Sequence, residues 1–523
     1  MKQCPNCGNQ PQDGEKSCGV SQTPDASRPC GDPAPKPEAL RKKKTGLIIG
    51  LIAVVLVVLA VLVVQQRPGT PENGEFGVLF LRDEQLWYVD ESGERLMREE
   101  PWNPGPPVAV SLDGRWLTYT EDPDSDVRSA LICRDTLSGE SRTVSQDVYS
   151  TSVTINPDGS EIYYIRGGEH TLCVDTDGKI AEISTGVTHY YPADSRIYYI
   201  VQTPEGRAQL FCWDQGESRL LETSGILTVL QAYSNGEIYF QCDERVDARE
   251  LLVDDGAPAE IRECLNRYVD VSSYWWSDGE TVECLAEQAL NPIGEADCSA
   301  YEQEPVLLVP RLPELSGFAS GEELEKALEE IHDGVCAYDL SLARGRELTH
   351  AADGVEWASM SDDCSHVIWL ANPDENGRGQ ICVWPMQGEP DILAENVWPN
   401  TLGIQGSDQA YWTADGILYR NGESLGEAEP FGWCTAGVEG FLYMQNGDEL
   451  CVWQDGSSRT LTGGLEAYNT AVRSSRLLYR NSQGEIYSYD RGEPRLLAKN
   501  ADRLLQSIWE GYSSLPTGYA LDR

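Results

Sequence analysis

Two patterns of hydrophobic and polar positions divide this chain. Residues 46–64 contain no charged or polar side chain, and nineteen such residues match the length that an α-helix needs to cross a ~30 Å hydrocarbon core. From about residue 75 the pattern changes to short apolar runs, rich in aromatic and β-branched residues and separated by turn residues. The first pattern predicts a transmembrane α-helix over 46–64, and the second predicts an all-β domain over 75–510.

The charges beside the apolar segment predict its orientation. Four basic residues, 41–44, precede it directly, whereas Arg67 alone follows directly. The positive-inside bias places the N-terminus in the cytoplasm and residues 67–523 outside, as in a single-pass protein of the cell membrane. A cleaved signal peptide is the alternative, but its charged leader and apolar core would both be too long, and no small-residue cleavage site follows.

A strand ending in Asp or a similar residue recurs about every 35 to 45 residues, a spacing typical of propeller repeats. Its ten copies are 86–90, 131–135, 171–175, 210–214, 250–254, 335–339, 381–385, 417–421, 450–454 and 486–490. A turn followed by an apolar strand precedes several copies, as in 111–119, 156–165 and 361–370. A polar turn and a fourth strand follow, as in 492–497. Four antiparallel strands in this order predict one propeller blade.

The recurring order of S-x-D-G, apolar strand, aromatic-x-Asp and Gly-Glu-x-Arg-x-Leu resembles the TolB-like and related WD-repeat-like β-propellers over about 75–510. The resemblance implies an all-β fold of four-stranded antiparallel blades. It also implies binding of proteins, peptides or glycans, although some relatives are fused to a hydrolase domain. The first unit lacks its inner strand, while residues 504–509 have no unit of their own. We therefore expect the two ends to complete one blade and close the ring.

Ten copies are compatible with one large ring, with a ring of seven or eight in which irregular units imitate blades, or with two tandem rings. We predict a single ring of about eight blades, within a range of seven to ten. An insertion is expected at about 277–333, where the repeat is stretched. In it, Ser320 to Glu323 form a capping box that predicts a short helix with Leu324, Ala327, Leu328 and Ile331 on one face.

The N-terminal segment 1–22 resembles a bacterial zinc ribbon. Cys4 and Cys7 form an intact C-x-x-C knuckle, but in the second knuckle Ser21 replaces the thiolate that should follow Cys18. Tetrahedral zinc needs four ligands, and Cys30 is available as the fourth. Two interpretations stay open: one structural zinc on Cys4, Cys7, Cys18 and Cys30, or a remnant without stable metal. The Pro-rich and basic segment 23–45 reads as a flexible linker, residues 65–74 as a stalk and 511–523 as a tail.

Charge and cysteine spacing restrict the outer part further. Residues 1–66 carry a formal charge of +3 and the whole chain −45, so the remainder is near −48. Such a surface disfavours nucleic acid and anionic lipid and attracts cations or basic partners. Cys133, Cys173 and Cys212 lie two residues before the Asp-like position, and Cys336, Cys382 and Cys451 lie three before it. We expect these six to be buried between sheets, the two sets facing opposite sides, and Cys284 and Cys298 to be the best disulfide candidates.

The sequence offers few catalytic motifs. Residues 422–426 match G-x-S-x-G, but they lie in a hairpin of a repeat, without the strand-to-helix turn that a nucleophile elbow needs. The five histidines are widely spaced, and the alternating Asp122, Asp124 and Asp126 lack the Gly and Glu of a calcium loop.

Aromatic residues recur where each unit enters its inner strand, and these are the candidate ligand-binding residues at the channel mouth. They are Trp102, Tyr149, Tyr190, Tyr274, Trp357, Trp398, Trp433 and Tyr468. Flat aromatic faces suit sugars and peptide side chains; the other interpretation is that these rings wedge adjacent blades together. We expect a non-catalytic recognition module. The rival hypotheses are a propeller-type polysaccharide lyase or hydrolase using channel carboxylates, and an architectural subunit of an envelope complex.

Overall fold

The computed structural model describes residues 78–90, 93–99, 108–111, 114–121, 128–149, 152–156, 158–193, 195–251, 268–290, 297–299, 304–312, 315–316, 318, 320–332, 336–361, 363–374, 376–406, 408–431, 438–469 and 477–505. All of them belong to the compact unit Thr70–Arg523. The predicted zinc-ribbon-like segment 1–22, linker 23–45, transmembrane helix 46–64, stalk 65–74 and tail 511–523 lie outside the described residues. Among the residues that are described, no helix has the length and apolar character needed to span a membrane.

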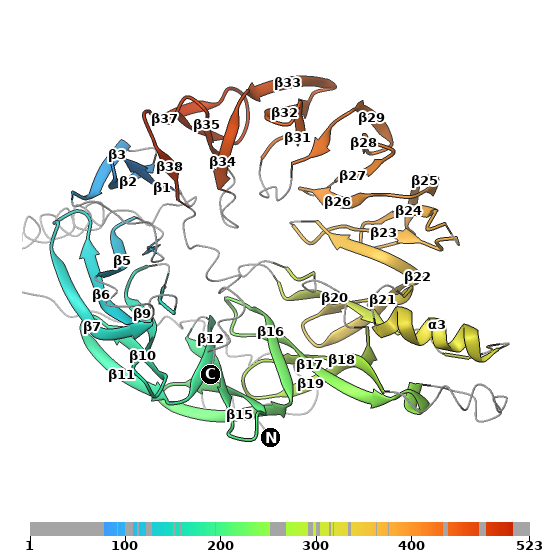
Figure 1. Ribbon diagram of the computed structural model, residues 1–523, viewed down its shortest axis with the longest axis horizontal. Helices are drawn as coiled ribbons and strands as arrows, with labels where there is room; N and C mark the ends of the chain where they lie inside the picture. The colour runs from blue at the N-terminus through green and yellow to red at the C-terminus, as the bar shows by residue number, and fades with distance from the viewer. Residues whose placement is uncertain are drawn as a thin grey trace, which may run out of the picture. The chain divides into compact units, whose positions relative to one another are not determined.

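The described strands pair as four-stranded antiparallel blades, each running from a first to a fourth strand (Figure 1). Blade 1 contains β38 (Arg503–Leu504), β1 (Val78–Arg82), β2 (Gln85–Asp90) and β3 (Gly93–Arg98). Blade 2 contains β4 (Ala109–Val110), β5 (Trp116–Glu121), β6 (Arg128–Asp135) and β7 (Ser141–Tyr149), and blade 3 contains β8 (Thr154–Ile155), β9 (Glu161–Arg166), β10 (Thr171–Thr176) and β11 (Lys179–Ser184). Blade 4 contains β12 (Val187–Ala193), β13 (Arg196–Gln202), β14 (Ala208–Asp214) and β15 (Glu217–Ser224).

The next three blades share one continuous sheet. Blade 5 contains β16 (Ile226–Ala232), β17 (Ile238–Asp247), β18 (Tyr268–Ser277) and β19 (Val282–Ala289), with a 3₁₀ turn η1 (Ala248–Leu251) after β17. Blade 6 begins with residues 297–299, which bridge to β20 (Val306–Arg311), and continues with β21 (Tyr338–Arg344) and the first half of β22 (Glu347–Met360). Blade 7 contains the second half of β22, β23 (Val367–Ala371), β24 (Gly379–Trp384) and β25 (Asp391–Val397).

The last three blades are regular. Blade 8 contains β26 (Thr401–Gln405), β27 (Gln409–Ala414), β28 (Ile417–Arg420) and β29 (Glu423–Gly426). Blade 9 contains β30 (Glu429–Pro430), β31 (Phe441–Gln445), β32 (Glu449–Gln454) and β33 (Ser457–Thr462), and blade 10 contains β34 (Leu465–Asn469), β35 (Leu477–Asn481), β36 (Ile486–Tyr489) and β37 (Arg495–Ala498). The described strands therefore form ten blades, the upper limit of the predicted range of seven to ten and more than the favoured number of about eight.

The two ends of the described chain meet in blade 1, which closes the ring. β38 pairs with β1 through Phe80↔Leu504 and Leu81↔Arg503. The amide of Asp502 donates to Leu81 O at 2.7 Å, and the amide of Leu505 donates to Leu79 O at 2.9 Å. The predicted closure by an N-terminal and a C-terminal strand is confirmed, and the described residues form a β-propeller.

The blades are held together by apolar side chains packed between consecutive sheets. One cluster joins blades 10, 1 and 2, others join blades 2 with 3, 3 with 4 and 4 with 5, and the same pattern continues around the ring. In the second strand of a blade, alternate side chains reach opposite neighbours: Ile162 packs toward blade 2, whereas Tyr163 packs toward blade 4. This explains why the second strands read as continuous apolar runs rather than as an alternating pattern.

The hairpins give the ring two distinct faces. The turns between first and second strands, and between third and fourth strands, lie at one end of the blades, the turn face; Ser111–Gly114 is an example. The connections between second and third strands, and the links between blades, lie at the other end, the insertion face. Val78 begins β1 at the turn face, because it pairs with Val89 near the end of β2.

The polar residues of the repeat hold the turn face together. Asp135 Oδ1 accepts the amides of Leu137 and Ser138, so this carboxylate caps the turn that follows its strand. Arg142, in the fourth strand of blade 2, donates to both oxygens of Asp175 in blade 3 at 2.8 and 2.7 Å. The predicted Asp-ended strands and Gly-Glu-x-Arg turns thus stabilise turns and join neighbouring blades.

The irregular region differs from the predicted insertion in its bounds. β19 and β20 lie within 277–333, but they are strands of blades 5 and 6. The repeat is instead interrupted by the connection between β20 and β21, which contains α3 (Gly321–His332). The copies at 250–254 and 335–339 are not third strands, because η1 ends at Leu251 and the third strands of blades 5 and 6 are β18 and β21. These two blades carry long connections that displace the motif, yet both are complete.

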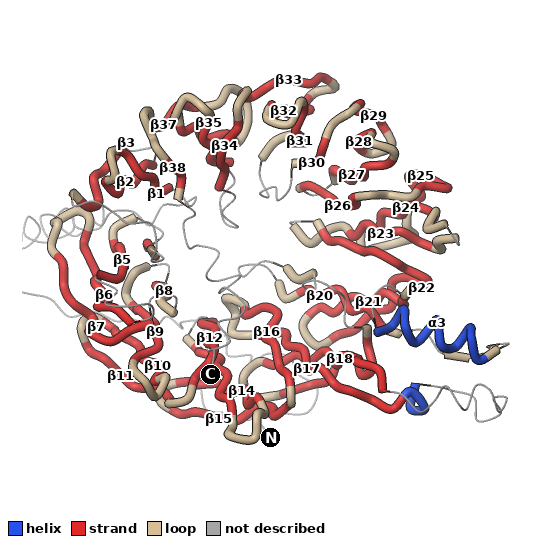
Figure 2. The backbone as a smooth tube through the Cα atoms, in the orientation of Figure 1, coloured by secondary structure: helices blue, strands red, loops and turns tan. Residues whose placement is uncertain are grey.

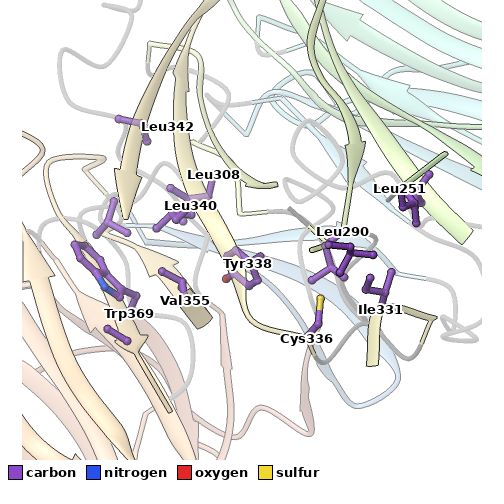
Figure 3. Packing of buried hydrophobic residues seen from close by; sticks show 14 of the residues in the cluster. Leu251, Leu290, Leu308, Ile331, Cys336, Tyr338, Leu340, Leu342, Val355 and Trp369 are labelled. Carbon is purple, nitrogen blue, oxygen red and sulfur yellow. The ribbon is translucent and has the colours of Figure 1, made fainter. Parts of the chain in front are cut away.

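Helix α3 forms as its sequence predicts. The amide of Glu323 donates to Ser320 Oγ at 3.3 Å, which is the N-cap bond. Leu324, Leu328 and Ile331 are buried, and they pack against a hydrophobic cluster that includes Val246 and Val269 of the long β17–β18 hairpin. Figure 2 shows α3 beside this hairpin, and Figure 3 shows Ile331 near Leu290 and Cys336 inside the cluster.

Candidate functional site

The eight aromatic residues expected at the channel mouth do not form one site. Trp102 and Trp433 lie outside the described residues. Tyr190 and Tyr274 are buried, Tyr149 is partly buried, and Trp357, Trp398 and Tyr468 are exposed. The burial of Tyr190 and Tyr274 favours the other interpretation, in which such rings wedge adjacent blades together.

Tyr190 lies in the first strand of blade 4 and reaches into blade 3. Its hydroxyl oxygen is 2.7 Å from Ser152 O, 3.0 Å from Tyr163 O and 3.1 Å from Thr154 Oγ1. Its side chain is 1% exposed, and burial raises the pKa of its hydroxyl well above the ordinary value. Tyr190 is therefore a structural link between two blades.

Tyr274 belongs to the third strand of blade 5 and not to a first strand. Its hydroxyl donates to Leu290 O at 3.3 Å, and its ring packs with Tyr233 and Leu307 between blades 5 and 6. The sequence suggested an inner-strand entry here because the long β17–β18 connection shifted the apparent phase of the repeat.

Two further candidates are paired with ring neighbours. The hydroxyl of Tyr149 lies 2.9 Å from His170 Nε2, and the two rings meet edge to face with centroids 5.1 Å apart. Tyr468 packs on Phe431 with centroids 4.5 Å apart. Tyr468 is the fourth residue of β34, so it lies closer to the turn face than to the insertion face. Neither residue lies in blade 7, which carries both exposed tryptophans.

Trp357 and Trp398 are the exposed aromatic residues of blade 7 at the insertion face. Trp357 lies on the inner half of β22, opposite Leu370, and its side chain is 38% exposed. Trp398 follows β25 in the link to blade 8, and its side chain is 61% exposed. Both side chains present aromatic surface to solvent on the face that carries α3.

The position of Trp398 is fixed by a glycine below its ring. A Cβ on Gly377 would lie 3.5 Å from Trp398 Nε1, so the indole rests directly over this residue. Gly377 has a φ of +72° in the loop between β23 and β24, and its amide donates to Asp374 O at 2.8 Å. Asp374 Oδ1 accepts the amides of Asn376 and Arg378, and these bonds lower the pKa of the carboxyl. A turn of defined shape thus supports an exposed indole.

Large exposed apolar side chains of the described residues separate into two groups. Ile226, Tyr268, Trp357 and Trp398 lie at the insertion face, all in blades 5 to 7 or the link that leaves blade 7. Leu137, Ile180, Leu220, Ile392, Tyr468 and Leu496 lie elsewhere, mostly on fourth strands and turns toward the turn face. We call the first group the rim patch. Ile226 and Tyr268 were missed by sequence reasoning; for Tyr268 the long gap between the copies at 250–254 and 335–339 was an available signal.

Acidic groups accompany the rim patch. Glu356 directly precedes Trp357. The pKa of the Glu356 carboxyl is raised, first by burial and then by the negative charge of Glu330 on α3. Glu395 is exposed three residues before Trp398. Two cations of the region pair with carboxylates: Lys326 with Glu330 at 3.2 Å, and Arg245 with Asp270 at 2.8 Å. A third, Arg378, donates to the carbonyl of Asn396. The surface around the patch therefore has a negative character.

One titratable group lies deeper between blades 6 and 7. Asp297 Oδ2 accepts the amide of Met360 at 2.5 Å, which ties the first strand of blade 6 to that of blade 7. Burial raises the pKa of Asp297 to about 6, although the hydrogen bonds to its carboxylate have the opposite, lowering effect. Both the geometry and this bond to the backbone indicate a structural role in joining the two blades.

The cysteine predictions have mixed outcomes. Cys133, Cys173, Cys212, Cys336, Cys382 and Cys451 are buried, as expected. The expectation for their faces fails at Cys173, which packs toward the preceding blade while Cys133 and Cys212 pack toward the following one. Cys284, on the fourth strand of blade 5, and Cys298, on the first strand of blade 6, are free thiols, so neither forms the expected disulfide. The proposed zinc ligands Cys4, Cys7, Cys18 and Cys30 lie outside the described residues, as do Asp122, Asp124 and Asp126.

The G-x-S-x-G sequence has the hairpin context expected for it. Ser424 lies in β29, a fourth strand that pairs with β28, and its Oγ accepts the amide of Gly426 at 3.3 Å. Three or more His, Cys, Asp or Glu residues placed to hold a metal ion are not found within the described ranges.

No protein-family model matches the sequence, and no curated protein matches it. Similar solved structures include the β-propeller domain of the Trilobed protease from Pyrococcus furiosus, with 12% identity and a TM-score of 0.28 over 74% of this chain and 98% of that one. Acylaminoacyl peptidase from Pyrococcus horikoshii has 13% identity and a TM-score of 0.31; the match covers 82% of this chain but 53% of the peptidase. Oligogalacturonate lyase from Vibrio parahaemolyticus has 10% identity and a TM-score of 0.30, covering 66% and 95%. At these TM-scores, the fold assignment stands on strand pairing and ring closure.

Proposed function

We propose that this chain is a single-pass membrane protein whose TolB-like β-propeller is a non-catalytic module that recognises a protein, peptide or glycan outside the cytoplasm. The apolar segment 46–64 is the anchor in this proposal, with the N-terminus in the cytoplasm. The N-terminal piece binds one structural zinc through Cys4, Cys7 and Cys18 of the ribbon-like segment and Cys30 of the linker.

The observation that carries the recognition proposal is the exposed indole of Trp398 above Gly377. The fold buries most of its aromatic rings between blades, among them Tyr164, Tyr198 and Trp369. Trp398 keeps 61% of its side chain exposed and still has a defined support below its ring. An ordered aromatic face costs little conformational entropy when it binds, and it suits the apolar faces of sugars and peptide side chains.

The test is a binding screen of the full-length chain in detergent against arrays of glycans, cell-wall fragments and peptides. Trp398→Ala and Trp357→Ala should abolish the binding that the parent chain shows. Ile392→Ala is the matched control, because Ile392, 53% exposed, lies between the two tryptophans in exposure and belongs to the same blade, but is on β25 toward the turn face. Loss of binding in the control alone, or turnover of a polysaccharide by the parent chain, would contradict the proposal.

The zinc proposal is tested separately by metal analysis of the chain purified under reducing conditions. We expect one zinc per chain and its loss on Cys4→Ser. Absence of zinc from the parent protein would instead support a ribbon that no longer binds metal.

A further inference from the structure

The rim patch lies on the face of the ring opposite to the point where the chain enters it. Val78 begins β1 at the turn face, whereas α3 and Trp398 lie in connections at the insertion face. The described fold therefore places the rim patch at the opposite end of the blades from Val78.

The fold itself shows what an aromatic face beside a carboxylate binds. The guanidinium of Arg82 lies 4.8 Å from the ring centroid of Trp87 and pairs with Glu94 at 2.7 Å. In blade 2, the Arg115 guanidinium lies 5.0 Å from the Trp116 centroid and pairs with Asp135 at 3.0 Å. In both places an arginine of the chain contacts an indole and a carboxylate together.

At the rim patch the indoles and carboxylates are present, but among the described residues no guanidinium lies over Trp357 or Trp398. Arg378, in the loop below Trp398, donates to Asn396 O at 3.1 Å. Glu356 is held near Glu330, and the repulsion between the two carboxylates helps to raise the pKa of Glu356. A cation supplied from outside would complete the combination and relieve this repulsion.

Resting on the proposed recognition function, we propose that the rim patch binds an arginine-containing, cationic segment of a partner protein. Two guanidinium groups stack on Trp357 and Trp398, and Glu356 and Glu395 pair with them. The negative surface speeds the approach of such a segment and repels anionic glycans, nucleic acid and anionic lipid.

The experiment measures fluorescence anisotropy of a fluorescein-labelled dodecapeptide of alternating Arg and Gly. The full-length chain is used in nanodiscs of phosphatidylcholine, and a Glu-Gly peptide of the same length is the second probe. We expect the Arg-Gly peptide to bind, with affinity that falls as salt is added, and the Glu-Gly peptide not to bind. The double change W357A/W398A should weaken binding by about tenfold.

Matched variants separate a site from general charge attraction. Glu356→Gln with Glu395→Gln should weaken binding several-fold more than Glu140→Gln with Glu217→Gln, a pair exposed at the turn face. I392A/L220A is the control for the tryptophans, since both residues are exposed on fourth strands. Urea unfolding midpoints show whether each variant folds. If W357A does not fold, W398A alone is used for the test, because the side chain of Trp398 is mostly exposed and its removal should leave the fold intact.

Equal losses in the rim and turn-face pairs, or equal binding of the two probes, would overturn this inference. If a glycan or neutral peptide from the array depends on Trp398 while the Arg-Gly peptide does not, the recognition function stands and the cationic partner is wrong. If no ligand depends on Trp398, both fail together.

Discussion

Tyr190→Phe distinguishes a ring that joins blades from a ring that binds ligand. The side chain of Tyr190 is 1% exposed, and its hydroxyl meets Ser152 O and Tyr163 O in the neighbouring blade. Phenylalanine keeps the ring and its packing, so the change removes only the hydroxyl. Because that hydroxyl has one proton, the cost is one buried hydrogen bond and the desolvated acceptor left behind, about 1–2 kcal/mol.

Tyr190→Ala removes the ring as well and leaves a cavity between blades 3 and 4, for which we expect about 3–5 kcal/mol. Equilibrium urea unfolding, followed by tryptophan fluorescence, measures both values. Tyr268→Phe is the matched control, because its side chain is 67% exposed and the change should stay within about 0.5 kcal/mol. A Tyr190→Phe variant as stable as the parent, or one that folds normally but loses ligand binding, would refute the structural assignment.

Three further changes test closure, turn geometry and the buried carboxyl. Leu504→Ala should lower the free energy of unfolding by about 2–5 kcal/mol, because Leu504 is buried where β38 closes the ring. In the same urea titration, the control Leu496→Ala should change this free energy little, because Leu496 is exposed. Equal effects of the two changes would argue against closure. Gly159→Ala should lower the free energy of unfolding by about 2–4 kcal/mol, because φ is +75° and the new Cβ would overlap the Trp116 indole. The control Gly178→Ala, with φ +82° and open space around it, should lower it by about 1–2 kcal/mol. Similar losses in the two variants would rule out a contribution from overlap with Trp116. The carboxyl of Asp297 has a folded-state pKa near 6, above its unfolded value, so its ionisation destabilises the fold as pH rises from about 4 to above 6. Between pH 4.5 and 7.5 the parent chain should therefore lose stability on the order of 2–3 kcal/mol, and Asp297→Asn should remove this loss. An unchanged pH dependence of unfolding in the variant would contradict this prediction.

Local patterns in the sequence predicted the regular part of the fold. The turn residues from Ser111 and Asn156 occupy the hairpins expected of them, Ser320 caps α3, and the last strand completes the first blade. The turns and the helix cap depend on residues a few positions apart. The closure was predictable because the repeat pattern shows that the first unit lacks its inner strand.

The irregular blades and the site were less predictable because they depend on contacts between distant segments. Blade 6 takes its first strand from residues 297–299, too short to give a pattern, and its third strand follows an inserted helix. Tyr190 and Trp398 are both aromatic and lie near the entry to the inner strand of a blade. Tyr190 meets carbonyl groups of another blade, whereas the Trp398 indole lies over Gly377 and stays mostly exposed, a difference that no local pattern contains.

Strand β22 has a mechanical consequence for the ring. Its fourteen residues serve first as the outer strand of blade 6 and then as the inner strand of blade 7, so hydrogen-bonded backbone runs without a break from β16 to β25. Blades 2 and 3 share a sheet through the single pair Val148↔Arg166, and the remaining blades are joined mainly by side chains. Blades 5 to 7 should open as a unit. In native-state hydrogen exchange, amides of these three blades should share one opening free energy, giving the surface that carries α3 and the tryptophans a stiff base.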